Sequence, residues 1–344
     1  MNFQIKFGRI NTAVTVYFPE DCPNSCPFCT SKASYGEKRP NVDKVLDRLK
    51  KWSNTQLPDV VITGGEPSAN VALLKRMVDV IPTNKNVYIN TTFLESTKTE
   101  FIEYVNTEPK IKAVNISRHS PNYHLDCQIL HGIAQDKDIT KITKPVKINA
   151  VASFSMAIVK RWLSLGKNNL RVSFRQNYNQ GALENLHHPY DETNIAMAQN
   201  LRYVGHSQCH VCDTTLFEYR GLFVDYHRGL PLTSLETTDP TTNNTVLEIN
   251  DVIIFQDGSS GYDWDGRRVL DNLGDVIPYA FRVARIPHCC DTTVHSAICN
   301  RAAHTESIPN PPAACNSYCG FTGGRGWCGS TTSHISTCDC FLHC

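Results

Sequence analysis

The first half of the chain combines two hydrophobic periods that alternate regularly. Short apolar runs rich in β-branched and aromatic residues predict strands, and apolar residues spaced three or four positions apart predict amphipathic helices. The predicted strands are residues 13–18, 60–63, 86–93, 111–116, 146–151 and 170–174, and the predicted helices are residues 42–52, 73–81, 100–105 and 155–165.

This repeating strand–helix order predicts the fold class. Six βα units in a row imply an α/β protein whose parallel strands are joined by right-handed crossovers. Such a sheet curves into a partial (β/α)6 TIM-like barrel, which we expect over residues 1–200. Functional side chains of these barrels lie at the C-terminal ends of the strands. Polar residues follow most of the predicted strands, so we expect the chemistry there.

The pattern changes beyond residue 200. Segments 216–221 and 252–258 each place a glycine turn after strand-forming residues, which predicts β-hairpins. We expect residues 201–288 to form a hairpin-rich region that covers the open side of the barrel and sets substrate specificity. Residues 289–344 are expected to form a Cys-rich tail.

Charge and hydropathy narrow the classes of partner and the cellular location that the sequence allows. The 344-residue chain has a formal net charge of +1, so gripping nucleic acid through its phosphates is not indicated. No apolar run is long enough to span a bilayer, so no membrane partner is expected. The first six residues carry no signal-peptide pattern. These features predict a cytoplasmic protein.

Three cysteines follow the first predicted strand with C-x3-C-x2-C spacing, at Cys22, Cys26 and Cys29. Thiolates this close together can hold one compact inorganic group. Structural zinc normally takes four protein ligands, and cysteine usually caps every iron of a four-iron cluster. Three cysteines would leave one iron of such a cluster open to bind another molecule.

The second motif is Gly64-Gly65-Glu66-Pro67, directly after the apolar strand 60–63. Glycines at a strand end permit positive φ and allow the backbone to approach a ligand closely. Backbone carbonyls and the Glu66 carboxylate would suit an ammonium group. Taken alone, the motif also fits a strand that ends in an ordinary tight turn.

Together these motifs resemble those of the radical S-adenosylmethionine (radical SAM) enzyme superfamily. The resemblance rests on the cysteine spacing, with Phe28 directly before the third cysteine, and on the similar Gly-Gly-Glu-Pro turn. It implies a 4Fe-4S cluster on Cys22, Cys26 and Cys29 whose open iron binds the methionine moiety of S-adenosylmethionine. It also implies an electron donor of the flavodoxin or ferredoxin type, and reductive cleavage to a 5′-deoxyadenosyl radical that abstracts hydrogen from a substrate.

The resemblance also implies cofactor contacts at the strand ends. Besides Gly64, Gly65, Glu66 and Phe28, the expected cofactor-binding residues are Thr91, Ser117, Arg118 and Asn149. A guanidinium can bind a carboxylate through two parallel hydrogen bonds, so Arg118 would suit the methionine carboxylate. Asn149 would suit the ribose hydroxyls. Each of these residues also fits a plain strand cap, and no catalytic residue is assigned.

Cysteine is distributed unevenly. Nine of the 15 cysteines lie between Cys289 and Cys344. An odd total without a secretion signal favours metal ligation or free thiols over a disulfide framework. The candidate auxiliary metal site, for a second iron–sulfur cluster or zinc, draws on Cys209, Cys212, Cys315 and Cys319. The alternative is a flexible tail with unused thiols.

The predicted function is a radical SAM enzyme that acts on a nucleotide, another small molecule or a peptide. The alternative, from a different class, is a non-catalytic zinc-binding interaction protein whose Cys22 loop and tail bind zinc. The regular βα units after Gly64-Gly65-Glu66-Pro67 argue against that alternative. The colour of anaerobically purified protein distinguishes the two, since a cluster is brown and zinc is colourless.

Overall fold

A computed structural model describes residues 4–7, 13–29, 39–55, 57, 59–175, 199–208, 212–229, 234–238, 245–249 and 251–262. Its helices are α2 (Val42–Ser53), η1 (Pro67–Ala69), α3 (Val71–Asp79), α4 (Lys98–Thr107), α5 (Tyr123–Ile129), α6 (Asp136–Ile139) and α7 (Met156–Leu163). Its strands are β1 (Gln4–Phe7), β2 (Ala13–Tyr17), β3 (Asp59–Thr63), β4 (Asn86–Thr91), β5 (Ile111–Ser117), β6 (Val146–Val151), β7 (Leu170–Arg175), β8 (Arg202–Gln208), β9 (Cys212–Tyr219), β10 (Leu222–Gly229), β11 (Ser234–Thr238), β12 (Thr245–Ile249), β13 (Asp251–Ile254) and β14 (Ser260–Gly261).

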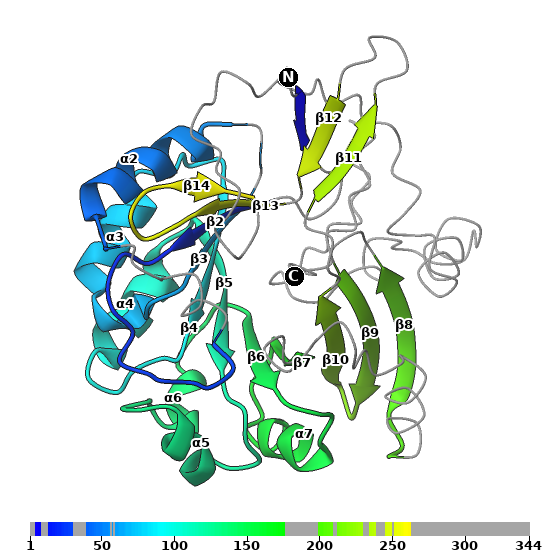
Figure 1. Cartoon of the computed structure of the whole chain (residues 1–344). Coiled ribbons are helices and arrows are strands. Elements are labelled where there is room, and N and C mark those ends of the chain that lie inside the picture. Colours follow the sequence, from blue (N-terminus) through cyan, green and yellow to red (C-terminus); the bar gives the residue numbers. More distant parts are fainter. Residues whose placement is uncertain are drawn as a thin grey trace, which may run out of the picture.

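The central feature is a curved sheet in the order β14-β13-β2-β3-β4-β5-β6-β7-β10-β9-β8 (Figure 1). Every neighbouring pair from β13 through β2 to β7 and β10 is parallel. Antiparallel pairs occur only at the two edges. The sheet ends in β14 and β8 and does not close through described strands, so it is a partial barrel. The predicted α/β partial barrel is confirmed.

Helices cover the outer face of this sheet (Figure 1). Helix α2 shows why its sequence folds this way, because Val45, Leu49 and Trp52 recur at helical spacing and are fully buried. The Asn41 side chain caps its first turn by accepting a hydrogen bond from the Lys44 amide, at 3.1 Å. The six predicted strands and four predicted helices all occur within a few residues of their expected ranges.

The inner face of the barrel is polar on β6, whereas on β2 to β5 it carries the small apolar cluster of Ala13, Val61, Tyr88 and Ala113. Strand β6 alternates Val146, Ile148 and Ala150 in the main core with Lys147 and Asn149 on the other face. Parallel strands covered on both faces usually read as continuous apolar runs. Here one face packs against helices, and the opposite face carries hydrogen-bonding side chains. Polar side chains are therefore available on the inner face at β6.

Both predicted hairpins are present, and they extend the barrel sheet. Strand β9 turns into β10 through Arg220 and Gly221, whose φ values of 51° and 85° fit a two-residue type I′ turn. Strand β10 then pairs in parallel with β7, and β13 pairs in parallel with β2. The hairpin-rich region thus contributes two strands to the parallel part of the barrel. A second small sheet contains β1, β12 and β11.

Several predictions fall outside the described residues. These are the Cys-rich tail with Cys315 and Cys319, and Cys209 of the candidate auxiliary site. The backbone of Cys212 is described because it begins β9. Among the described helices, none is both long and apolar enough to cross a bilayer.

Candidate active site

The two sequence motifs lie next to each other at the C-terminal ends of neighbouring strands. The cysteine loop follows β2, and the Gly64-Gly65-Glu66-Pro67 turn follows β3, its direct parallel neighbour. Thr91 ends β4, Ser117 ends β5 and Asn149 lies near the end of β6. Because parallel strands share one direction, all these residues lie along the same edge of the sheet.

The cysteine loop makes a tight turn with its thiols partly exposed. Cys22, Cys26 and Cys29 are half-buried and outside any disulfide, and the Cys29 amide donates to the Cys26 carbonyl at 3.1 Å. The Phe28 ring packs edge-on against His119, with a centroid distance of 4.5 Å. Burial raises the pKa of the Cys22 thiol, and the nearby Glu66 and Cys29 charges raise it further.

This thiol set fits an iron–sulfur cluster. Burial disfavours the free thiolate of Cys22, and a cationic cluster deprotonates a thiol that coordinates it. Among the described residues, no three His, Cys, Asp or Glu side chains are grouped as a single metal ion would require. A four-iron cluster takes one cysteine per iron, so its thiolates need not converge on one point.

The glycine turn packs directly on the backbone that leads into the cysteine loop. Gly64 and Gly65 have φ values of 64° and 52°, in the left-handed region that favours glycine. A Cβ atom at Gly65 would overlap the Glu20 carbonyl oxygen and lie 2.9 Å from the carbonyl oxygen of Phe18. The second glycine of the motif is therefore required by this backbone contact.

We expect Gly65→Ala to destabilise the fold by about 3 kcal/mol or more, because left-handed strain adds to a backbone clash. The matched control is Gly166→Ala, since Gly166 has a φ of 61° and nothing within 4 Å of its would-be Cβ. That control should cost only about 1–2 kcal/mol. Urea unfolding measures both variants, and equal losses would show that the contact with Glu20 is unimportant.

Glu66 is the centre of a buried hydrogen-bond network. Glu66 is 1% exposed, and its carboxylate accepts hydrogen bonds from three residues. Oε1 receives the Ser68 amide at 3.0 Å, the Ser68 hydroxyl at 2.7 Å and the Thr91 hydroxyl. Oε2 receives the Thr92 amide at 2.7 Å and the Thr92 hydroxyl at 2.6 Å. A carboxylate offers about four lone-pair sites, so these five donors fill it.

Each hydroxyl in this network donates to Glu66, because an ionised carboxylate can only accept, and each hydroxyl oxygen accepts another N–H in turn. Leu94 N donates to Ser68 at 3.0 Å, and Phe93 N donates to Thr91 at 2.8 Å. Asn24 Nδ2 donates to Thr92 Oγ1 at 3.1 Å.

Asn24 brings the cysteine loop into the same network. It lies between Cys22 and Cys26, is 2% exposed, and also accepts the His131 amide at 2.6 Å. A chain of two side-chain hydrogen bonds therefore joins the loop to Glu66 through Thr92. The contact of Glu66 with a methionine amino group remains a prediction, and its observed partners give it a role in holding the loop.

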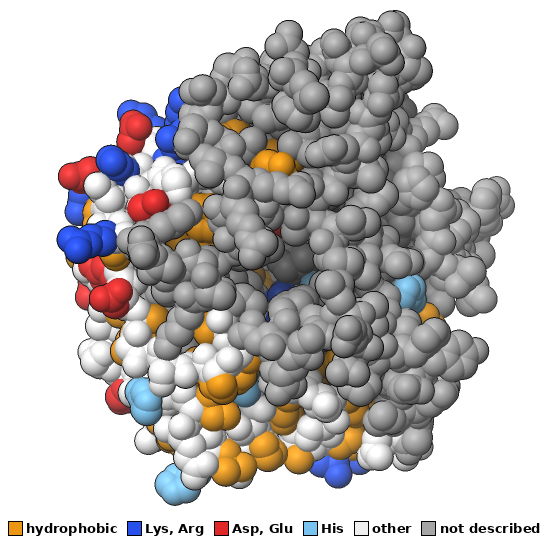
Figure 2. All heavy atoms as spheres, in the orientation of Figure 1, with side chains coloured by type: hydrophobic (Ala, Val, Ile, Leu, Met, Phe, Trp, Pro, Cys, Tyr) orange, Lys and Arg blue, Asp and Glu red, His pale blue; other side chains and the backbone are white. Residues whose placement is uncertain are grey.

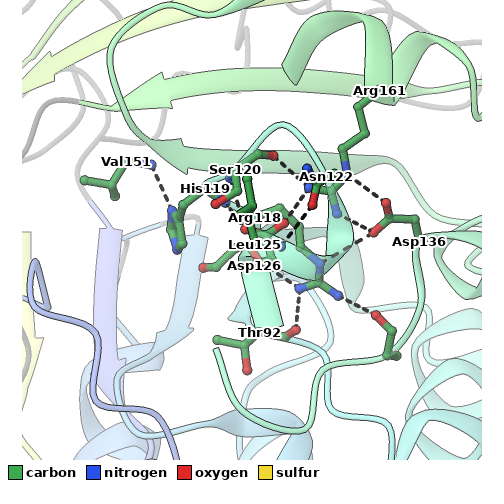
Figure 3. Close-up of polar contacts among 12 residues, drawn as sticks. Thr92, Arg118, His119, Ser120, Asn122, Leu125, Asp126, Asp136, Val151 and Arg161 are labelled. Atoms are coloured by element: carbon green, nitrogen blue, oxygen red, sulfur yellow. Dashed lines mark hydrogen bonds and ion pairs between the residues drawn. The ribbon is translucent and has the colours of Figure 1, made fainter. Parts of the chain in front are cut away.

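Arg118 is fully buried behind the strand ends (Figure 3). Its guanidinium donates to the carbonyls of Thr92 at 2.7 Å, Ser117 at 2.8 Å and Ala134 at 2.8 Å. Burial lowers the pKa of Arg118 to about 10, so it stays charged at neutral pH. Gripping a methionine carboxylate remains a prediction for Arg118, and its observed contacts tie the ends of β4 and β5 to the following loop.

A second arginine, Arg161, pairs with the two carboxylates that lie near Arg118. Arg161 on α7 forms a two-pronged pair with Asp136, with both distances 2.8 Å, and also pairs with Asp126 at 2.5 Å (Figure 3). Asp126 accepts the His119 amide at 2.7 Å and the Ser120 amide at 3.0 Å. Breaking one partner of a buried pair usually costs several kcal/mol. This network fixes the loop that presents His119 to Phe28.

His119 is held neutral. Burial, together with the Arg118 charge, lowers the pKa of His119 from 6.5 to about 3. Its Nδ1 accepts the Val151 amide at 3.0 Å, which places the ring proton on Nε2. A neutral ring suits the edge-on contact with Phe28.

The depressed pKa of His119 predicts how stability changes with pH. Between pH 6.5 and 3 the unfolded chain binds a proton at this residue and the folded chain does not, so stability falls as pH falls. We expect a loss of about 2 kcal/mol between pH 7 and pH 5 from this group. His119→Gln should remove that loss and exposed His124→Gln should keep it, as measured by urea unfolding. An identical loss in all three proteins would contradict the prediction.

The remaining expected residues lie at the same strand ends. Ser117 and Asn149 are half-buried, and Asn149 Oδ1 accepts from Arg175 Nε at 3.3 Å. The sequence analysis did not assign roles to Asn24 and Arg175. The position of Asn24 between Cys22 and Cys26 could have identified it as a candidate site residue. Arg175 ends a predicted strand, and this position could have identified it as a candidate site residue.

Comparisons with known proteins agree with this site. Residues 11–117 match the family described as a 4Fe-4S single cluster domain. This segment includes the cysteine loop, the glycine turn and the ends of β4 and β5. No curated protein sequence matches the chain.

Solved structures also resemble the chain. One is the crystal structure of Streptococcus suis SuiB bound to precursor peptide SuiA, with 12% sequence identity and a TM-score of 0.49. The match covers 78% of this chain and 64% of SuiB, so the chain spans less than two thirds of that protein's length. The part of the chain that matches the 4Fe-4S single cluster domain carries both sequence motifs, the cysteine loop and the glycine turn.

Proposed function

We propose that the chain binds a 4Fe-4S cluster through Cys22, Cys26 and Cys29 and uses it to cleave S-adenosylmethionine. The observation that carries this proposal is the direct coupling of the two motifs. Gly65 packs on the carbonyls that lead into the cysteine loop, and Asn24 connects that loop to Glu66 through Thr92. A mere tight turn after a strand would not require either contact.

When bound, the cluster supplies the electron that breaks the sulfonium and yields a 5′-deoxyadenosyl radical for hydrogen abstraction. The protein supplies binding, orientation and exclusion of water. Gly64 and Gly65 let the turn pack against Tyr17 and against the backbone of Phe18 and Glu20, which holds the proposed methionine-binding turn beside the cysteine loop. Phe28 of the loop and the neutral His119 ring form a packed, uncharged contact.

The substrate and the electron donor are also part of the proposal. The reaction would remove hydrogen from a nucleotide, another small molecule or a peptide, and a flavodoxin or ferredoxin type protein would supply the electron. Thr91, Ser117, Arg118 and Asn149 remain the proposed contacts around the bound cofactor. Thr91, Ser117 and Asn149 lie on strands that end at the same edge as the cysteine loop, and Arg118 directly follows β5.

Anaerobic reconstitution with iron and sulfide tests the function. The protein should become brown, and dithionite with S-adenosylmethionine should release 5′-deoxyadenosine, detected by mass spectrometry. A colourless protein that retains zinc and releases no 5′-deoxyadenosine would instead support the non-catalytic zinc-binding alternative.

An auxiliary metal site is a further part of the proposal. Nine cysteines beyond residue 288 would be prone to oxidation unless many of them bind metal, and Cys209 and Cys212 would add two ligands. We expect the full chain to bind more iron or zinc than one four-iron cluster requires. A chain truncated after Asn300 should lose the excess and keep the N-terminal cluster. Equal metal content per chain would show that Cys315 and Cys319 are not ligands.

A further inference from the structure

Three neutral polar side chains form a hydrogen-bonded row across the inner face of the barrel. Asn90 Nδ2 on β4 donates to Thr63 Oγ1 on β3 at 3.1 Å, and Asn115 Nδ2 on β5 donates to Asn90 Oδ1 at 2.6 Å. Ile62 and Ile89, which precede Thr63 and Asn90, pair with each other and belong to the main core under the helices. The row therefore faces the barrel interior, and we call Thr63, Asn90 and Asn115 the amide ladder.

The amide ladder lies at the depth to which the barrel interior is accessible. One inner-face position closer to the N-terminal ends of the same strands, Val61, Tyr88 and Ala113 form an apolar cluster with Ala13, and each is 9% exposed or less. The three ladder residues, in contrast, are only half-buried. Figure 2 shows that the surface is hollowed near the middle of the molecular face. A group that enters from the strand ends would meet the ladder before the apolar cluster.

The ladder also lies directly beside the proposed cofactor site. Each of its residues comes one or two positions before a residue expected to contact the cofactor, namely Gly64, Thr91 and Ser117. The strands that carry the ladder are β3, β4 and β5, and β3 is the parallel neighbour of β2, which leads into the cysteine loop. The ladder is therefore placed for a molecule that reacts beneath the cofactor.

Asn115 keeps hydrogen-bonding capacity for such a molecule. A side-chain amide has two N–H donors and an oxygen with two lone pairs. The contact with Asn90 uses one donor of Asn115. If the row runs in the opposite sense, with Thr63 donating to Asn90 and Asn90 donating to Asn115, it uses one lone pair instead. In either sense at least one N–H and one lone pair of Asn115 make no hydrogen bond to a described residue.

We propose that the amide ladder binds an amide group of the substrate through the remaining N–H and oxygen of Asn115. An amide offers one acceptor and one donor, and asparagine forms such paired hydrogen bonds with the edges of nucleic-acid bases. The ladder itself carries no charge, and Lys147 follows Asn115 in the register, which disfavours a cationic ligand. The same amide chemistry occurs in peptide side chains and in nucleobase rings. This inference rests on the proposed function, since it assumes that a substrate lies beneath the cofactor.

Small probes test the ladder without turnover. We would titrate acetamide, uracil and acetate into the cluster-loaded protein, without S-adenosylmethionine, and follow each probe by ligand-observed NMR. Saturable binding of acetamide or uracil is expected, with acetate weaker, because acetate offers acceptors only. Tighter binding of acetamide than of uracil would indicate a peptide side-chain amide, and the reverse order would indicate a nucleobase.

Two variants localise the binding. Asn115→Leu should weaken amide binding about tenfold or more, the loss expected for a paired hydrogen bond. Asn115→Asp keeps the size of the side chain and can still accept from Asn90, but it has no N–H for the ligand, so it should weaken binding by a similar factor. Asn54→Leu is the matched control, because Asn54 is exposed at the end of α2 and donates to Lys50 O. Binding should be unchanged in that control.

The outcomes separate this inference from the proposed function. Absence of saturable amide binding, acetate that binds as tightly as acetamide and uracil, or binding that survives both Asn115 substitutions would overturn the amide ladder as a ligand site. Each of these results could occur in a protein that still releases 5′-deoxyadenosine. Asn115-dependent amide binding in a protein that releases no 5′-deoxyadenosine would support the site and contradict the proposed reaction.

Discussion

Cys29→Ala is expected to abolish both cluster binding and the release of 5′-deoxyadenosine. A four-iron cluster held by three cysteines cannot lose one ligand and still keep a single open iron. The Cys29 N–H also closes the loop turn by donating a hydrogen bond to the Cys26 carbonyl, and alanine keeps that backbone hydrogen bond. The substitution therefore removes the thiolate while preserving the fold of the loop. Iron content, visible absorption and mass spectrometry measure the effect.

The matched control is Cys127→Ala. Cys127 lies on α5 and is half-buried, as the three loop cysteines are, but it belongs to a helix outside the site. This variant should keep its colour, its iron and its activity. Release of 5′-deoxyadenosine by Cys29→Ala at the rate of Cys127→Ala would show that the cluster assignment is wrong.

Glu66→Gln is expected to destabilise the protein by about 3 kcal/mol before any cofactor is added, because a buried network loses an acceptor. An amide in place of the carboxylate offers one acceptor oxygen and turns the other position into a donor. If the amide nitrogen replaces Oε2, it faces the Thr92 amide and hydroxyl, which both donate to this atom. Thr92 would then lose its partner and its hold on Asn24.

The measurement separates the two roles of Glu66. Urea unfolding of the cluster-free protein should show the loss of stability, and iron content should show weaker cluster retention. A side chain whose only task is to bind a methionine amino group would leave both unchanged and weaken only cofactor affinity. Glu100→Gln is the control, since its ion pair with Lys75 is about half exposed and should contribute little.

Local sequence patterns predicted the elements of the barrel well. The helices are amphipathic, and the strands before residue 176 are short apolar runs bounded by turns, so periodicity identifies both. The glycine–glycine motif was informative for the same local reason, because left-handed backbone needs glycine.

The sequence could not predict which strands and side chains far apart along the chain would contact each other. Strands β10 and β13 read as hairpin strands, and their parallel pairing with β7 and β2 depends on contacts far along the chain. The sequence analysis expected Arg118 to bind the methionine carboxylate or to serve as a strand cap, and it did not indicate that the side chain is fully buried among three backbone carbonyls and Asp136. Two of the five donors to Glu66 come from its near neighbour Ser68, and folding brings the other three from Thr91 and Thr92, which the sequence did not indicate.

The pairing of β13 with β2 also sets an order of events during synthesis. Val16 is made early, yet its sheet neighbour Ile254 follows 238 positions later in the chain. At ribosomal rates of about 5–20 residues per second, roughly 10 to 50 s separate the two. Throughout that interval the edge of β2, the strand that leads into the cysteine loop, lacks its neighbour β13. Cluster delivery should therefore follow the synthesis of β13, and the three thiols must stay reduced until then.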